Sequence, residues 1–254
     1  MLGGPFHRVH LGMASVLITP RYGEALQWAA DLHREQRRHG KDVPYLSHVI
    51  AVSSLVWEDG GNEDQAIAGL LHDAIEDAGQ SHGSIAHRFG SPVADIVQDC
   101  TDPGKHEANG NAAAWFRWKR LYLDSLARKP EASLLVNAAD KAHNAWDHLL
   151  DSHRDPTYWQ RVRAGLESSA LYFQRLEQEL KRRLPGSRSV ERLGGAVEGI
   201  LALPEFLRVL PRGGDPMEWA LTYERRLATI HGDSRPHAWE DEGGASREKP
   251  ARSG

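Results

Sequence analysis

The stretch LLHDAIEDAG, residues 70–79, places four ionisable side chains inside an otherwise apolar helical pattern. His72 and Asp73 are adjacent, and Glu76 and Asp77 follow each of them by four positions. Residues four apart lie on one face of a helix, so a continuous helix would stack these side chains in two neighbouring columns. Buried carboxylates are costly without a cation, and a bound metal ion would offset that cost. The alternative is a solvated acidic face at the end of an amphipathic helix.

Two further stretches place isolated polar groups in apolar helices. LLVNAADKAHNAW, residues 134–146, sets Asp140 and Asn144 four apart, and PYLSH, residues 44–48, opens a valine-rich helix with His48. Taken singly, Asp140 could be capped or salt-bridged, and His48 could be a satisfied core or capping residue. Three such groups in separate helices weigh against the ordinary reading of each one, because every uncompensated buried polar group is costly.

The spacing of apolar residues predicts an all-α fold. They recur at three- and four-residue steps, with Pro or Gly between blocks, and no stretch alternates as a strand does. Helices are expected near 21–38, 46–58, 62–78, 83–99, 112–128, 131–151 and 156–183, then near 187–203 and 215–230. The segment TDPGKHEANGN, residues 101–111, is predicted to be an interior loop.

Composition excludes several classes of protein. The net charge of −4 and the absence of a long basic stripe argue against nucleic-acid and membrane-surface partners. No apolar run approaches the roughly 20 residues of a membrane span, and residues 1–20 lack the apolar stretch of a secretion signal. A single cysteine, Cys100, excludes an intramolecular disulfide. A cytoplasmic protein is therefore expected.

The order His48, His72-Asp73, Asp140 resembles that of the HD-domain metal-dependent phosphohydrolases. Within that superfamily, residues 21–183 resemble the guanosine-3′,5′-bis(diphosphate) 3′-pyrophosphohydrolases, which are the hydrolase half of the RelA/SpoT homologues and of the small alarmone hydrolases. The blocks that carry this resemblance are HREQRRHGKDVPYLSH (33–48), AIAGLLHDAIEDAG (66–79), HRFGSPVADIVQDCTD (87–102), WFRWKRLYLDSL (115–126) and LLVNAADKAHNAW (134–146). It implies an HD-domain helical bundle with a C-terminal helical extension.

The domain organisation follows from this resemblance and from composition. The predicted parts are an N-terminal leader (1–20), an HD-domain hydrolase (21–184), a helical extension (185–232) and a disordered tail (233–254). The tail is polar and rich in Gly, Pro and charge, so it has too little apolar surface to join a core. The extension is too short for a nucleotidyl-synthetase domain, which implies a single-function hydrolase. It could mediate homodimerisation or cap the core.

The resemblance also implies the metal and the catalytic groups. One Mn²⁺ would be held by His48, His72, Asp73 and Asp140. Glu76 and Asp77 would orient and deprotonate the attacking water. Imidazole and carboxylate ligands suit Mn²⁺, and a carboxylate beside a cation stays ionised as a base.

Four residues are candidates for substrate binding. Arg38 would contact the nucleotide or a site carboxylate, with Arg37 as the alternative register, and Asn144 would hold the sugar or phosphate side. Lys119 would reach a phosphate, or else snorkel to the surface. Tyr45 would touch the guanine or ribose, or else pack before the His48 helix.

The expected reaction removes the 3′-pyrophosphate of ppGpp or pppGpp, giving GDP or GTP and pyrophosphate. Asn137, Ala142 and Trp146 depart from the family's usual Lys or Ser, Leu and Arg, in positions expected to shape the base and ribose pocket, so guanine or adenine preference stays open. One alternative is the same chemistry on an adenosine alarmone or NADPH, including service as an antitoxin that destroys a partner enzyme's product. Another is a catalytically idle nucleotide-binding regulator, which a lost ligand or acid would indicate; none is lost.

Overall fold

The computed structural model describes residues 18–102, 112–210 and 214–229, and in these ranges it contains thirteen α-helices and no β-strand. The all-α prediction is confirmed. The helices are α1 (Pro20–Leu32), α2 (Leu46–Glu58), α3 (Glu63–Leu71), α4 (Ala74–Ala78), α5 (His82–Phe89), α6 (Ser91–Cys100), α7 (Ala112–Leu126), α8 (Glu131–Arg154), α9 (Tyr158–Arg161), α10 (Gly165–Arg183), α11 (Arg188–Leu201), α12 (Pro204–Leu207) and α13 (Pro216–Thr229).

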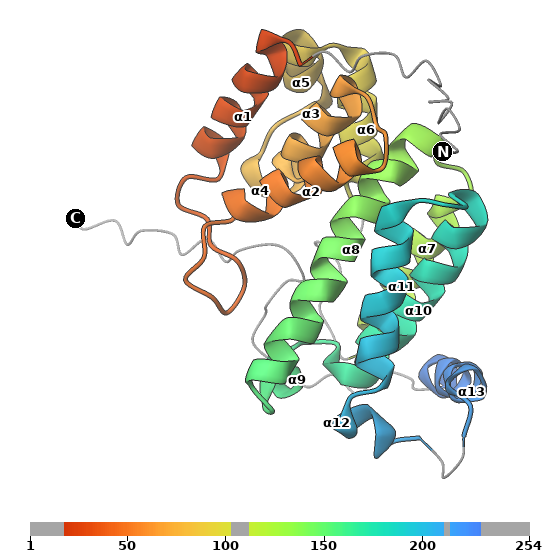
Figure 1. Ribbon diagram of the computed structural model, residues 1–254. Coiled ribbons are helices and arrows are strands. Elements are labelled where there is room, and N and C mark those ends of the chain that lie inside the picture. The colour runs from red at the N-terminus through yellow and green to blue at the C-terminus, as the bar shows by residue number, and fades with distance from the viewer. Residues whose placement is uncertain (1–17, 103–111, 211–213, 230–254) are drawn as a thin grey trace, which may run out of the picture.

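The long helix α8 runs through the middle of the molecule, between α1–α6 on one side and α7, α10 and α11 on the other (Figure 1). Two hydrophobic clusters meet along it. Val136 and Ala139 pack into the cluster formed with α1–α6, whereas Leu134, Ala138 and Ala142 pack into the cluster formed with α7 and α10–α13. Because α8 is buried on both sides, Asp140 emerges from it in a position shielded from solvent.

The expected single helix over residues 62–78 is wrong, because the chain breaks at His72-Asp73. α3 ends at Leu71 and α4 begins at Ala74, with Asp73 at φ −100° and ψ 5°. The imidazole Nδ1 of His72 lies 2.9 Å from the carbonyl oxygen of Gly69, an acceptor that a continuous helix would use for a backbone amide. The break turns His72 and Asp73 toward the same region instead of leaving them in two columns with the acids.

The expected helix over residues 21–38 also ends early, at Leu32. Residues 33–45 form a loop that Arg38 closes by donating its backbone N–H to the carbonyl of Val43 at 2.8 Å. Gly40 sits in this loop at φ +64°, a left-handed conformation that side chains disfavour. The loop carries Gln36 and Arg38 toward α4 and α8.

Glycine divides two more of the expected helices. The 83–99 helix splits into α5 and α6 at Gly90 (φ +90°), and the 156–183 helix splits into α9 and α10 before Gly165 (φ +67°). The helix expected near 187–203 is present as α11, and Pro204 starts the short α12 after it. The helices expected near 46–58, 112–128, 131–151 and 215–230 are present as α2, α7, α8 and α13.

The helical extension is tied to the HD bundle at the start of α11. Asp59, which follows α2, accepts hydrogen bonds from the backbone N–H of Arg188 at 2.5 Å and from the hydroxyl of Ser187 at 2.9 Å. Further along α11, a Cβ on Gly199 would meet the side chain of Leu149 of α8 at 2.5 Å, so this leucine packs directly against the α11 backbone. α11 and α13 therefore belong to the same hydrophobic cluster as α7, α8 and α10.

Parts of the predicted leader, interior loop and tail lie outside the described residues, namely 1–17, 103–111 and 230–254. Within the described ranges, no helix combines the length and the apolar character needed to span a bilayer.

Candidate active site

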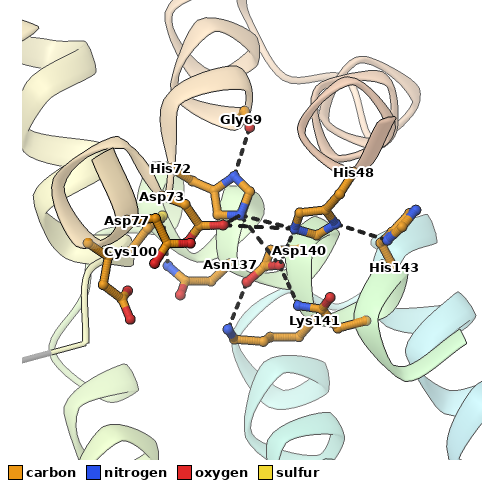
Figure 2. Close-up of polar contacts among 12 residues, drawn as sticks. His48, Gly69, His72, Asp73, Asp77, Cys100, Asn137, Asp140, Lys141 and His143 are labelled. Carbon is orange, nitrogen blue, oxygen red and sulfur yellow. Dashed lines mark hydrogen bonds and ion pairs between the residues drawn. The ribbon is translucent and has the colours of Figure 1, made fainter. Parts of the chain in front are cut away.

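Three side chains from three helical segments converge at the centre of the bundle (Figure 2). The Nε2 atom of His48, on α2, lies 3.3 Å from Nε2 of His72, after α3, and 3.2 Å from Oδ1 of Asp140, on α8. Nε2 of His72 lies 3.5 Å from the same oxygen. One donor atom from each residue falls within 4.8 Å of the other two, and all three residues are buried.

The outer nitrogens of both imidazoles are engaged, which directs the inner lone pairs toward one point. Nδ1 of His72 contacts the Gly69 carbonyl, and Nδ1 of His48 lies 3.0 Å from Nδ1 of His143. With the protons on Nδ1, two imidazole lone pairs and a carboxylate oxygen face each other. Such a set repels itself without a cation and suits a first-row divalent metal. The residues present therefore fit a metal site.

The ionisation of the three groups differs, because burial and the neighbouring charges act differently on each. Burial lowers the pKa of His48 to about 3, and the Arg38 guanidinium adds to this effect. Burial also disfavours a charged His72, but the carboxylates of Asp73 and Asp140 outweigh it and raise the pKa of His72 well above its usual value. For Asp140, burial is outweighed by Lys141 and His72, so its pKa falls well below normal. The site thus holds a carboxylate that requires a cationic neighbour.

Lys141 is a site residue that sequence reasoning missed. Its ammonium group lies 2.7 Å from Oδ2 of Asp140, on the opposite oxygen from the two imidazoles. Burial opposes its charge, yet the Asp140 carboxylate raises the pKa of Lys141 well above normal. The signal was present in the sequence as a lysine directly after Asp140 in an apolar helix.

Asp73 lies beside the three converging donors. Its Oδ2 atom is 2.8 Å from Nε2 of His72 and 4.0 Å from Nε2 of His48. The hydroxyl of Tyr45 donates a hydrogen bond to the same oxygen. Tyr45 is fully buried and its ring packs on His33 and His48. A contact between Tyr45 and the base or ribose does not fit this placement, and the residue supports Asp73 instead.

The acidic pair Glu76 and Asp77 follows on α4, half-buried. Oδ2 of Asp77 accepts a hydrogen bond from the amide of Gln36 at 3.0 Å, and Oε2 of Glu76 accepts one from the backbone N–H of Asp102 at 3.3 Å. The side-chain oxygen Oε1 of Gln36 in turn contacts Nδ1 of the buried His33 at 2.5 Å. Gln36 and His33, which sequence reasoning did not assign, hold Asp77 in place.

Arg38 reaches α8 from the loop and is buried. Its guanidinium donates to Oδ1 of Asn144 at 2.9 Å and to Oδ2 of Asp147 at 2.8 Å, while its Nη1 atom is buried without a hydrogen-bond partner. The side-chain amide of Asn144 donates to Oδ1 of Asp140 at 2.7 Å. Asn144 therefore links Arg38 to the carboxylate that faces His48 and His72. Arg37 instead pairs with the exposed Asp42, so the register that selects Arg38 fits the structure.

Lys119 is buried on α7 among aromatic rings rather than snorkelling to the surface. Its ammonium group lies 4.3 Å from the ring centre of Trp118 and 5.2 Å from that of Tyr172. Cation–π attraction to these rings favours a charged lysine in this position. A contact of Lys119 with a phosphate stays a prediction.

The three departures from the family pattern, Asn137, Ala142 and Trp146, lie in two different surroundings on α8. Ala142 and Trp146 line a cavity between α2, α8 and α11. Ala142 lies two positions from both Asp140 and Asn144, and Trp146 lies two positions after Asn144. Two positions correspond to about 200° around a helix, so Ala142 and Trp146 face another side of α8. Asn137 is buried, accepts a hydrogen bond from the Tyr122 hydroxyl and donates to the Ser133 carbonyl at 2.8 Å.

The fold and the convergent His, His and Asp define the class of protein. Residues 25–172 match the family model described as HD domain. The chain belongs to the HD-domain family, in the branch of the guanosine-3′,5′-bis(diphosphate) 3′-pyrophosphohydrolases.

Two curated relatives place it in that branch. The guanosine-3′,5′-bis(diphosphate) 3′-pyrophosphohydrolase MESH1 of Drosophila melanogaster is 32% identical over 146 residues, which cover 56% of this chain and 76% of the relative. Its counterpart in Xenopus tropicalis is 32% identical over 127 residues, which cover 49% of this chain and 67% of the relative.

A solved structure supports the same assignment. It is described as a metazoan orthologue of SpoT that hydrolyses ppGpp and plays a role in starvation responses. It is 28% identical to this chain and superposes with a TM-score of 0.53. The match covers 73% of this chain and 96% of the neighbour, so the shared fold extends over nearly all of that protein.

Proposed function

We propose that this protein hydrolyses the 3′-pyrophosphate of ppGpp or pppGpp and releases pyrophosphate with GDP or GTP. The observation that carries the proposal is the convergence of His48 Nε2, His72 Nε2 and Asp140 Oδ1 on one buried point. Relatives named for this reaction support the choice of substrate.

One Mn²⁺ would be held by His48, His72, Asp73 and Asp140. When bound, a divalent ion polarises a phosphoryl oxygen and makes a neighbouring water more acidic. His143 and the Gly69 carbonyl keep the two imidazoles in the tautomer that offers Nε2, and Tyr45 orients Asp73.

The acidic pair handles the proton of the attacking water. Glu76 and Asp77 would accept that proton as the water oxygen adds to the phosphorus bonded to the 3′-oxygen. The bond between this phosphorus and the 3′-oxygen breaks, and the oxygen leaves as a hydroxyl after gaining a proton. Gln36 fixes the carboxylate of Asp77, which limits the geometries the base can adopt.

The several negative charges of the 3′-pyrophosphate require cationic side chains as well as the metal. Arg38 is the leading candidate, because its buried Nη1 atom has no hydrogen-bond partner while its other nitrogens are held by Asn144 and Asp147. A buried donor without a partner is costly, and a substrate oxygen would satisfy it. Lys119 is the second candidate.

A substrate panel tests the proposal. The full chain is stripped with a chelator, reloaded with Mn²⁺, and incubated with ppGpp, pppGpp, an adenosine 3′-pyrophosphate, NADPH and a simple 3′-nucleotide. Released pyrophosphate and phosphate are measured separately. We expect pyrophosphate from ppGpp and pppGpp, and none after chelation.

The panel also separates the alternatives. Turnover of ppGpp no faster than that of NADPH or of the 3′-nucleotide would reject the alarmone assignment while keeping the phosphohydrolase class. No turnover of any nucleotide, with tight nucleotide binding, would identify an idle regulator.

A further inference from the structure

The cavity lined by Ala142 and Trp146 lies outside the candidate active site. Its volume is about 380 Å³, and its walls come from α2, α8 and α11. Binding sites for small molecules commonly have volumes from about 300 to 1,000 Å³, so this cavity is large enough for a compact ligand.

Small side chains on all three helices create this space. Ala51 of α2, Ala142 of α8 and Gly195 of α11 line it, and a Cβ built on Gly195 would meet nothing within 4 Å. One turn further along α11, Gly199 is in close contact with Leu149. The helices α8 and α11 are therefore closely packed beside the cavity.

The walls combine an aromatic surface with a few polar groups. Trp146 is 47% exposed, an unusual fraction for the largest apolar side chain, and the buried Leu55 adds an apolar wall. Glu58 accepts a hydrogen bond from Arg192 at 2.9 Å at the cavity edge. Flat aromatic rings stack on exposed indole faces, so the lining favours a planar ring with polar edges.

His143 connects this cavity with the candidate metal site. Its Nδ1 atom lies 3.0 Å from Nδ1 of His48, and within the described part of the chain its Nε2 atom has no hydrogen bond. If His48 offers Nε2 to a metal, its Nδ1 carries the proton and donates to His143. The proton of His143 then sits on Nε2, which becomes a donor available to a ligand in the cavity.

We propose that this cavity binds a planar heteroaromatic molecule of purine size and that its occupancy alters the candidate metal site through His143. The ring stacks on Trp146, a ring nitrogen or carbonyl accepts from Nε2 of His143, and a ring or amino N–H donates to Glu58. Binding itself does not depend on the proposed function. The effect on His48 rests on it.

Calorimetry on the full chain tests binding without turnover. Guanosine and adenosine, which carry no phosphate to hydrolyse, are titrated into the Mn²⁺-loaded protein. Ala142→Leu and Gly195→Leu fill the cavity from two different helices, and Trp146→Ala removes its aromatic wall. Each should weaken binding of at least one nucleoside about tenfold or more, whereas Trp146→Phe should retain it because a ring remains.

Controls separate this cavity from the nucleotide site. Arg38→Ala should leave nucleoside binding at the cavity intact. Binding lost in Arg38→Ala and kept in both leucine variants would overturn the proposal, as would no binding to the wild-type protein. Thermal unfolding checks that each variant is folded. If Ala142→Leu does not fold, Gly195→Leu alone tests the effect of filling the cavity.

The coupling has its own readout. The bound nucleoside should change the affinity for Mn²⁺, measured by competition with a chelating dye, in the wild-type protein and not in Gly195→Leu. If the affinity of the wild-type protein for Mn²⁺ is unchanged when the nucleoside occupies the cavity, the coupling is overturned. Because neither measurement uses turnover, failure of the proposed reaction would be seen separately in the substrate panel.

Discussion

The ammonium group of Lys141 lies 2.7 Å from Oδ2 of Asp140, while the other oxygen of that carboxylate faces His48 and His72. One buried carboxylate thus has a permanent cation on one side and a metal-compatible pair of imidazoles on the other. The lysine stabilises the ionised form of Asp140.

Replacement of Lys141 by Met should therefore destabilise the metal-free protein. Removing one partner of a buried ion pair costs about 3–5 kcal/mol, because the remaining charge is left uncompensated. Urea unfolding in the presence of a chelator should show this loss, and Mn²⁺ should recover part of it. Lys181→Met, at an exposed pair with Glu177, should change stability by about 1 kcal/mol at most. If Lys141→Met lost the same free energy of unfolding with and without Mn²⁺, the metal would not compensate Asp140. That result would contradict a role of Asp140 in holding both the lysine and the metal.

Replacement of Asp73 by Ala should abolish metal binding and turnover together, because it removes a proposed ligand. Elemental analysis after dialysis measures the metal content. Asp95→Ala, at an exposed carboxylate that pairs with His82, should keep both properties. Full metal occupancy in Asp73→Ala would remove this residue from the ligand set.

Replacement of Glu76 by Gln should retain the metal and lower kcat by about 10²–10⁴, the usual value of general-base assistance. The amide keeps an acceptor for the backbone N–H of Asp102 but cannot take a proton at neutral pH. Metal content and kcat are measured on the same sample. If both fall, Glu76 is a ligand rather than a base.

Replacement of Arg38 by Ala should impair turnover of ppGpp far more than it alters metal binding. The guanidinium lies next to Asn144 and Asp147, and its buried Nη1 atom has no hydrogen-bond partner, a need that a phosphate oxygen of the substrate would meet. Steady-state kinetics should show a higher KM, a lower kcat, or both. Arg37→Ala is the matched control, because that side chain pairs with Asp42 on the surface. Equal effects of the two variants would indicate a structural role for the loop.

The buried His148 should make the folded protein less stable in mild acid. Burial lowers the pKa of this imidazole to about 3, with the Arg38 charge adding to the effect. The folded protein therefore keeps His148 neutral, while the unfolded chain takes up a proton near its ordinary value of 6.5. Its contribution to stability is complete above about pH 6.5 and is lost as the pH falls toward 3.

His148→Phe tests this pH dependence, because the ring can still stack on Trp159. Between about pH 6.5 and 4, the slope of unfolding free energy against pH should become shallower than in the wild-type protein. The full shift corresponds to a contribution on the order of 3–5 kcal/mol. Urea unfolding at several pH values measures the slope, and an unchanged slope would refute the assignment.

Sequence reasoning could identify the all-α class and the separated polar motifs, because both are local properties. Helical periodicity is repeated in every block, and His48, the His72-Asp73 dipeptide and Asp140 each stand out against apolar neighbours. The meeting of the three converging donors followed from resemblance and from the cost of buried charge, and the structure brings them within 4.8 Å.

The direction of the side chains was decided only by tertiary structure. The break at His72-Asp73 depends on the His72 ring taking the Gly69 carbonyl, and the end of α1 at Leu32 frees Gln36 to reach Asp77 from 41 positions away. Ala142 and Trp146 face a cavity because α11 packs beside that side of α8. Periodicity reports which residues are apolar, whereas breaks, loop paths and the partner of each helix face depend on contacts between distant parts of the chain.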